Sequence, residues 1–154
     1  MLKINDKIPE FEILTDRDVF KISQHIGKNI VIFFFPKADT SGCTAETIAF
    51  TNLQKDFNEL NCIVIGVSKD KPQKQAKFRE KYNLTCELGA DFENNVCEQF
   101  GVWVEKSMYG KKYMGIQRAT FLCNSQSIIT NVWEKVKVPG HADEVLEAVK
   151  KISN

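Results

Sequence analysis

The stretch IVIFFFPKADTSGCTAETIAF, residues 30–50, decides the fold of this chain. Its first six residues are apolar and either β-branched or aromatic, which is the pattern of a central strand covered on both faces. Pro36 ends this run, because proline has no N–H group to donate to a β-ladder. After a polar turn the chain continues in an amphipathic pattern. A strand, a turn and a helix therefore follow one another, and Cys43 lies where the helix begins.

Apolar residues at spacings of three and four define this helix. They are Ala49, Phe50, Leu53, Phe57 and Leu60. The spacing predicts one helix from Thr40 to about Leu60, with Thr40 or Ser41 as its N-cap and Glu46 in its early turns, where a carboxylate complements the helix dipole. The first backbone N–H groups of a helix have no intrahelical partner, and the positive end of the dipole lies beside them. Both effects favour a thiolate over a thiol at Cys43.

The remaining segments alternate between strand and helix patterns. Residues 62–70, CIVIGVSKD, repeat the strand signature, so the first helix joins two parallel strands in a right-handed βαβ unit. The patterns further predict a hairpin within 9–22, helices at 71–82, 93–102 and 141–152, an extended piece at 87–91, a loop or ribbon at 103–116, and a strand pair within 117–138. This order is typical of an α/β chain with a thioredoxin-like fold, a central mixed β-sheet with helices on both faces, in a single domain spanning 1–154.

Composition and charge limit the possible partners. The chain has 154 residues, and its 21 basic and 20 acidic side chains are scattered, leaving a net charge of +1. This balance argues against binding to nucleic acid or to a membrane surface. The N-terminus lacks a signal-peptide core, and no apolar run is long enough to span a bilayer, so a cytoplasmic protein is expected.

The five cysteines are an odd number and contain no C-x-x-C pair, which fits neither a disulfide framework nor a zinc site. Cys62 and Cys123 lie at the ends of apolar strand patterns and are expected to be inert core thiols. A dithiol of the thioredoxin type would need a second cysteine where Glu46 stands. A single thiolate at Cys43 would instead attack an electrophile such as a peroxide, forming a sulfenic acid that another thiol must reduce.

Pro36, Thr40 and Cys43 have the spacing P-x-x-x-T-x-x-C, which resembles the active-site signature of the peroxiredoxins. Three separate segments are similar to the bacterioferritin comigratory protein, or peroxiredoxin Q, branch of that family. They are FFFPKADTSGCTAE at 33–46, EKSMYGKKYMGIQRATFL at 105–122 and VWEKVKVPGHADEVLEAV at 132–149. The resemblance covers nearly the whole chain.

The resemblance implies a thiol peroxidase that reduces hydrogen peroxide and small organic hydroperoxides without metal, haem or flavin. In that reading Cys43 is the peroxidatic cysteine, Thr40 orients the peroxide, Pro36 shields the thiolate, and Arg118 holds the thiolate and polarises the peroxide. Thr40 as a helix cap and Pro36 as a strand terminator are compatible with these roles. The resemblance also favours a monomer. His25 and His141, without ligand-like spacing, are expected at the surface or at helix caps.

One feature departs from the branch. Many members carry a resolving cysteine five residues after the peroxidatic one, where this chain has Ile48, and others carry it in the next helix, which here has no cysteine. Reduction by an external thiol (thioredoxin, glutaredoxin or glutathione) is the first-ranked route, Cys86 the second and Cys97 the third. The alternative function is a peroxide sensor or chaperone-like binding protein, switched by oxidation of Cys43.

Overall fold

The computed structural model describes residues 1–153 of the chain. A seven-stranded mixed sheet forms its centre, in the order β2-β1-β5-β4-β3-β8-β9. Its strands are β1 (Glu12–Thr15), β2 (Val19–Lys21), β3 (Asn29–Phe34), β4 (Cys62–Ser68), β5 (Glu87–Ala90), β8 (Ala119–Cys123) and β9 (Ile129–Trp133). A separate two-stranded ribbon consists of β6 (Trp103–Met108) and β7 (Lys111–Ile116).

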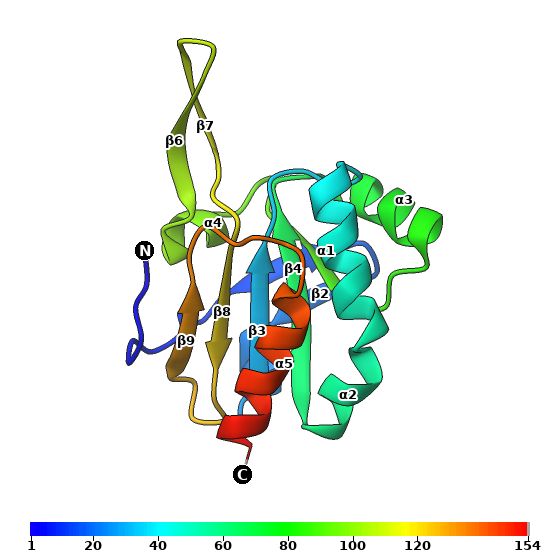
Figure 1. The fold of residues 1–154 in the computed structure, drawn as a ribbon, viewed down its shortest axis with the longest axis vertical. Coiled ribbons are helices and arrows are strands. Elements are labelled where there is room, and N and C mark those ends of the chain that lie inside the picture. Colours follow the sequence, from blue (N-terminus) through cyan, green and yellow to red (C-terminus); the bar gives the residue numbers. More distant parts are fainter. Residues whose placement is uncertain (154) are drawn as a thin grey trace.

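The helices are α1 (Ser41–Asn52), α2 (Gln54–Glu59), α3 (Pro72–Tyr82), α4 (Val96–Phe100) and α5 (His141–Ile152), and a short 3₁₀ turn, η1, spans Ile22–His25. Strand β3 runs parallel to β4 and antiparallel to β8, so it lies at the middle of a mixed sheet. The predicted βαβ unit is β3-α1-α2-β4. Figure 1 shows α1, α2 and α5 over the same face of this sheet.

Successive residues of β3 face two separate cores, because side chains alternate along a strand. The far-side core contains Ile30, Ile32 and Phe34 with Val96, Cys97 and Phe100 of α4. The thiol-side core contains Val31, Phe33 and Phe35 with Cys43, Phe50, Phe57, Phe78, Cys86 and residues of α5. Helices therefore cover both faces of the sheet, and the predicted fold class is confirmed.

Two contacts of the Phe33 ring, one with an aromatic residue and one with a glycine, fix α1 on the sheet. The ring of Phe33 stacks on that of Phe50 in α1, with 4.5 Å between the centroids. The same ring lies directly over Gly66 of β4, where a Cβ atom would be 2.5 Å from Phe33 Cζ. Because Gly66 has no side chain, the ring sinks against β4 and α1 packs close to the sheet.

The structure corrects the predicted helix over 40–60. It is interrupted at Leu53, whose φ and ψ of −101° and 8° lie outside the helical region and whose N–H reaches back to Phe50 O at 3.1 Å. Thr51 and Asn52, which have low helix propensity, precede the break. Of the two predicted N-cap residues, Thr40 and Ser41, Thr40 occupies the N-cap position, but its hydroxyl donates to Lys37 O at 2.9 Å rather than capping a helix N–H.

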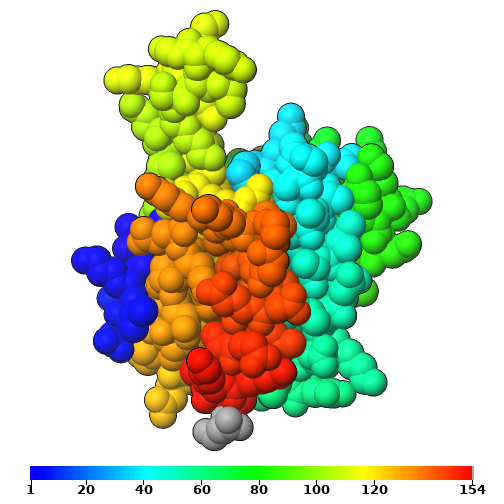
Figure 2. Space-filling view, viewed as in Figure 1, coloured from blue at the N-terminus to red at the C-terminus, as the bar shows by residue number. Residues whose placement is uncertain are grey.

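The segment predicted as a loop or ribbon is a β-hairpin. Tyr109 and Gly110 have φ values of 52° and 78°, as the two central residues of a type I′ turn require. The hairpin stands out from the body of the molecule (Figures 1 and 2). Tyr109 at its tip is 97% exposed.

The expectation for His141 was wrong. This residue begins α5, but its side chain is buried, lies 2.8 Å from Thr120 Oγ1 and meets the rings of Phe50 and Trp133 edge-on. Its place in the core is set by aromatic neighbours from distant segments. His25 is half-buried, with its ring stacked on Phe20. Within residues 1–153, no helix combines the length and apolarity that a membrane crossing requires.

Candidate active site

Cys43 is the third residue of α1 and is fully buried in the thiol-side core. The turn before it starts at the carboxyl end of β3, where Phe35 N still donates to Val67 O at 3.0 Å. Because Cys43 lies in the first turn of a twelve-residue helix, the unpaired N–H groups and the positive end of the dipole are adjacent to it. This position agrees with the prediction from residues 30–50.

Hydrogen bonds with three side chains from two other segments hold the active-site loop, residues 36–40. The N–H of Ala38 donates to Asp70 Oδ2 at 2.8 Å. Asp39, at a positive φ of 65°, accepts hydrogen bonds from Tyr82 Oη at 2.7 Å and from Lys81 Nζ at 3.0 Å. The hydrogen bond from Tyr82, and then that from Lys81, lowers the pKa of Asp39. The loop is thereby tied both to the segment after β4 and to the end of α3.

Arg118 contacts Cys43 although it lies 75 positions later in the sequence. It directly precedes β8, and its Nη2 lies 3.3 Å from Cys43 Sγ. Gly42 permits this approach, since a Cβ atom there would be 3.2 Å from Arg118 Nη2. A guanidinium at this distance stabilises negative charge on the sulfur. The structure thus brings together two of the four residues that the sequence assigns to the site.

Glu46 completes the group. It is 1% exposed, and its Oε1 accepts a hydrogen bond from Arg118 Nη1 at 2.6 Å. Its Oε2 is buried and has no hydrogen-bond partner among residues 1–153. Burial raises the pKa of Glu46 to about 7, outweighing the attraction of Arg118.

The sequence assigned Glu46 only a helix-dipole role and missed its ion pair with Arg118. The available signal was its position three residues after Cys43, which places both side chains on one face of a helix. Burial alone would lower the pKa of Arg118, but the Glu46 carboxylate and the Cys43 sulfur outweigh it and raise that pKa. The guanidinium therefore stays charged between a carboxyl and a thiol, a suitable arrangement for stabilising an anionic nucleophile.

Thr40 and Pro36 lie on the exposed side of the loop. Thr40 immediately precedes α1, and no hydrogen bond joins its hydroxyl to Cys43 Sγ in the described part of the chain. Pro36 follows β3 by one residue and is exposed, while Ala38 beyond it is buried. Both residues thus border the solvent side of the turn that leads to Cys43.

Cys86 is remote from Cys43. It shares the thiol-side core but lies at the other end of α1, where Thr85 N donates to Thr51 Oγ1 at 3.2 Å. Eight residues of helix, about 12 Å of rise, separate Thr51 from Cys43. Burial raises the pKa of Cys86 to about 12.

Cys97 is in α4 and faces the far-side core, across the sheet from Cys43. Burial, and then the neighbouring Asp91 carboxylate, raises its pKa far above the ordinary range. Cys62 and Cys123 are buried too, and burial raises the pKa of each to about 12, which agrees with their prediction as core thiols. Within residues 1–153, no group of three or more His, Cys, Asp and Glu side chains could hold a metal ion.

Residues 4–132 match the model of the AhpC/TSA family. The chain belongs to the AhpC/TSA family. Among its AhpC/TSA-type relatives, Peroxiredoxin Bcp of Bacillus subtilis (strain 168) is 41% identical over 153 residues, 99% of this chain and 98% of that protein. Putative peroxiredoxin bcp of Coxiella burnetii is 40% identical over 146 residues, 94% of this chain and 97% of that protein.

A solved structure of the Xanthomonas campestris bacterioferritin comigratory protein, described for its alkyl peroxide reduction activity, superposes with a TM-score of 0.90. It is 33% identical, and the match covers 97% of this chain and 100% of that one. These AhpC/TSA relatives confirm the prediction of a peroxiredoxin, a thiol peroxidase, of the bacterioferritin comigratory protein or peroxiredoxin Q branch.

Proposed function

We propose that Cys43 is the peroxidatic residue of this thiol peroxidase. Its thiolate attacks the terminal oxygen of a hydroperoxide, the O–O bond breaks, and the departing oxygen takes a proton and leaves as water or an alcohol. Cys43 is left as a sulfenic acid. The observation that supports this assignment is the 3.3 Å distance between Cys43 Sγ and Arg118 Nη2 in a site closed to bulk water.

The surrounding groups would stabilise the charge that moves from sulfur to the departing oxygen. Arg118 keeps its charge beside the sulfur, and the N–H groups of Gly42 and Cys43 at the start of α1 are further donors. Thr40 orients the peroxide through its hydroxyl, which in the structure donates to Lys37 O at 2.9 Å. Pro36 shields the entrance at the end of β3.

Hydrogen peroxide and small organic hydroperoxides are the proposed substrates. Cys43 is 0% exposed, and a buried sulfur favours compact substrates over bulky ones. The alkyl peroxide reduction described for the Xanthomonas campestris relative is consistent with this class.

An external thiol is the proposed reductant of the sulfenic acid, with thioredoxin, glutaredoxin and glutathione as the possible reductants. A disulfide needs Cα atoms about 4.4–6.8 Å apart. Cys86 is roughly 12 Å along α1 from Cys43 and would require much of that helix to unwind. Cys97 would have to cross the sheet, so it ranks last.

The neighbouring helix α3 is also held in place. Arg79 bonds Asp16 through two nitrogens and donates to the carbonyl oxygens of Leu84 and Cys86. The contacts of Asp39 with Tyr82 and Lys81 add a second attachment. A rearrangement that brings Cys86 toward Cys43 has to break these contacts, which further supports an external reductant.

Cys43→Ser tests the assignment, with Cys123→Ser as a matched control from a core strand. Loss of peroxide consumption in the first and retention in the second is expected. Turnover by Cys43→Ser at the wild-type rate would refute the mechanism. Mass spectrometry after one equivalent of peroxide, followed by Cys86→Ala and Cys97→Ala variants, tests the recycling route. An internal disulfide at either cysteine would replace the external-thiol assignment.

A second function, a peroxide sensor or chaperone-like binding protein, is favoured by the absence of a second thiol beside Cys43 in the described residues. Oxidation would then persist and alter a binding surface. Steady-state peroxide consumption with a thiol reductant separates the two. Many turnovers per molecule support the enzyme, and a single stalled oxidation supports the sensor.

We further propose that the protein acts as a monomer in the cytoplasm. All five cysteines are free thiols, as is common for proteins in a reducing compartment. Sedimentation of the reduced and oxidised chain tests the assembly state, and a stable dimer would overturn it.

A further inference from the structure

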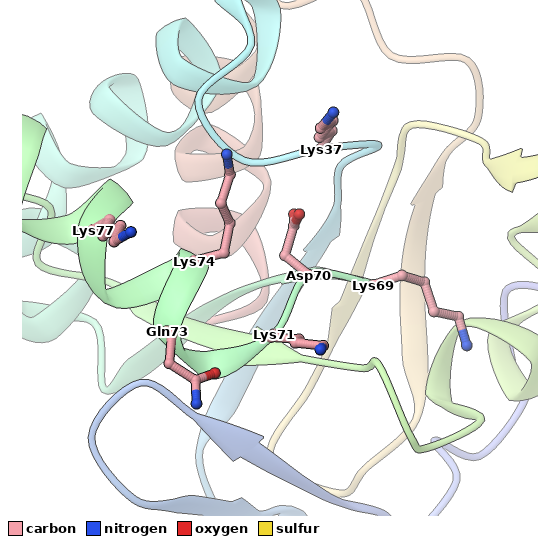
Figure 3. A pocket seen from close by; sticks show the side chains of 7 residues that line it. All are labelled: Lys37, Lys69, Asp70, Lys71, Gln73, Lys74 and Lys77. Atoms are coloured by element: carbon pink, nitrogen blue, oxygen red, sulfur yellow. The ribbon is translucent and has the colours of Figure 1, made fainter.

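A basic groove lies beside the active-site loop. Its cavity of about 580 Å³ is bounded by the loop after β3, the turn after β4 and the first two turns of α3 (Figure 3). The lysine groove, as we name it, is lined by Lys37, Lys69, Asp70, Lys71, Gln73, Lys74 and Lys77. Figure 3 shows the side chains of Lys37, Asp70 and Lys74 near one another, whereas Lys69 points away from them.

The positive charge of this groove is largely uncompensated. Lys69 is paired with Asp91 and Glu98 at 3.2 and 2.6 Å. The other four lysines form no ion pair within residues 1–153. Asp70 is the single acid of the lining, and its Oδ2 already accepts hydrogen bonds from Ala38 N and Ser68 Oγ. A chain with a net charge of only +1 therefore concentrates cations at this position.

Hydrogen bonds connect the lysine groove to the reactive cysteine. Lys37 O accepts the Thr40 hydroxyl at 2.9 Å, and Thr44 N donates to Thr40 O at 2.9 Å, at the start of the helix that carries Cys43. Asp70, which lines the groove, accepts a hydrogen bond from Ala38 N of the same loop at 2.8 Å. A ligand in the groove thus contacts the loop that leads into the helix carrying Cys43.

We propose that the lysine groove binds the anionic part of a low-molecular-mass thiol, one that carries several carboxylates or phosphates, and presents it to the Cys43 sulfenic acid. This inference rests on the proposed function, in which an external thiol reduces Cys43. The cavity has the size of a small-molecule site, typically about 300–1,000 Å³. Four free ammonium groups match a ligand with more than one negative charge.

The reaction needs two thiol molecules. The sulfur of the first attacks Cys43 Sγ, the S–O bond breaks, and the oxygen leaves as water with the protons of the sulfenic acid and the incoming thiol. The sulfur of the second attacks the mixed disulfide at the ligand's sulfur and releases Cys43 as a thiolate. Each thiol supplies one electron, so the sulfenic acid is reduced by two electrons and a symmetrical ligand disulfide is formed.

Stopped-flow measurement of sulfenic acid reduction, at low ionic strength, tests the groove. The probes are mercaptosuccinate (anionic), 2-mercaptoethanol (neutral) and cysteamine (cationic). The rate constant of each is divided by the concentration of its thiolate form before the three are compared. In the wild-type chain the anionic thiol is expected to react about tenfold faster than the neutral one, with an advantage that salt removes. The double variant Lys71→Gln/Lys74→Gln is expected to lose this advantage and to require more thiol for half-maximal rate. Lys150→Gln/Lys151→Gln on α5 removes the same charge elsewhere and serves as the matched control.

Equal rates for the three probes in the wild-type chain would overturn the proposal, as would an unchanged anionic preference in the groove variant. If the variant slowed reduction by thioredoxin and not by mercaptosuccinate, the groove would instead be a protein-docking surface. Calorimetric titration of the reduced chain with S-methylglutathione, which cannot react, is a second readout. An affinity for this ligand that is the same in the wild type and in the groove variant also contradicts the proposal. Oxidation of Cys43 by peroxide needs no thiol and is measured on the same samples. If Cys43 fails to oxidise, the proposed function fails as well, whereas normal oxidation with charge-independent reduction refutes the groove alone.

Discussion

The Nη2 atom of Arg118 lies 3.3 Å from the Sγ atom of Cys43, across 75 positions of sequence. Because of this contact, the reactivity of Cys43 in the first turn of α1 depends on Arg118, the residue before β8. Because Arg118 also bonds Glu46, it occupies one fixed orientation, and the sulfur is next to a charge that requires little reorganisation.

Replacing Arg118 should slow the oxidation of Cys43 and leave the fold intact. We expect Arg118→Met to lower the second-order rate constant with hydrogen peroxide by about a hundredfold. Arg118→Lys keeps the positive charge but loses the paired N–H donors of the guanidinium, so its rate constant is expected to lie between those of Arg118→Met and the wild type. Single-turnover tryptophan fluorescence measures this rate. Arg17→Met, which removes an exposed arginine paired with Glu87, is the control and should oxidise normally. A normal rate in Arg118→Met would separate the guanidinium from the chemistry.

Glu46 should make the stability of the fold depend on pH. Its pKa rises from an ordinary value of 4.5 to about 7 in the folded state. Between these values the folded chain holds a proton that the unfolded chain releases, so the free energy of unfolding falls as pH rises through this window. The full effect is about 3 kcal/mol.

The measurement is urea denaturation at several pH values between 4 and 8 for the wild type and for Glu46→Gln. The wild type should lose stability relative to the variant as pH rises, and the difference should level off above about pH 7. The comparison cancels other groups, including His141, whose pKa is lowered by burial. A constant difference would show that Glu46 does not titrate in this range.

The attachment of the active-site loop to α3 should be visible in hydrogen exchange. Tyr82→Phe removes the hydroxyl that donates to Asp39 at 2.7 Å and leaves the ring packed against Phe78. Amide exchange within residues 36–42 is expected to accelerate about fivefold, while exchange in β3 stays unchanged. Tyr109→Phe, at the exposed tip of the β6-β7 hairpin, is the control. Equal exchange in the three proteins would mean that the hydrogen bonds from Lys81 to Asp39 and from Ala38 to Asp70 hold the loop without the Tyr82 hydroxyl.

Gly66 should be intolerant of even one methyl group. A Cβ atom would lie 2.5 Å from Phe33 Cζ, so Gly66→Ala is expected to destabilise the fold by about 1–3 kcal/mol. Thermal or urea unfolding measures the loss. The double variant Gly66→Ala/Phe33→Leu relieves the overlap and should be more stable than the sum of the single effects predicts. Additive losses would place the strain elsewhere.

Local patterns predicted most strands and helices because these elements depend on residues that are close together in the sequence. The apolar run 30–35 and Pro36 gave the central strand and its end, and the residues after them gave the start of α1. Residues 103–116 were predicted only as a loop or a ribbon, and the structure shows a hairpin with a type I′ turn at Tyr109-Gly110. The break at Leu53 was missed, since weak propensity at two residues does not outweigh a continuous apolar stripe.

The sequence predicted individual residues of the site, and it did not predict most of the contacts between them. Cys43 was singled out by its position at the start of a predicted helix, Arg118 came from a segment that resembles the family, and the structure places the two in contact. The Arg118–Glu46 ion pair and the burial of His141 depend on elements that meet only in the folded chain. The lysine groove has the same origin, because Lys37 and Lys74 are 37 positions apart and become neighbours through the parallel pairing of β3 with β4.

The alternation along β3 has a use for engineering. Its even-numbered residues, such as Ile32 and Phe34, line a compartment that the reactive sulfur does not touch. A 4-fluorophenylalanine label at Phe34 would therefore report on the integrity of the sheet and be silent to the catalytic cycle. Paired with a second label at Phe33 on the opposite side, it would supply an internal reference for following turnover by fluorine NMR.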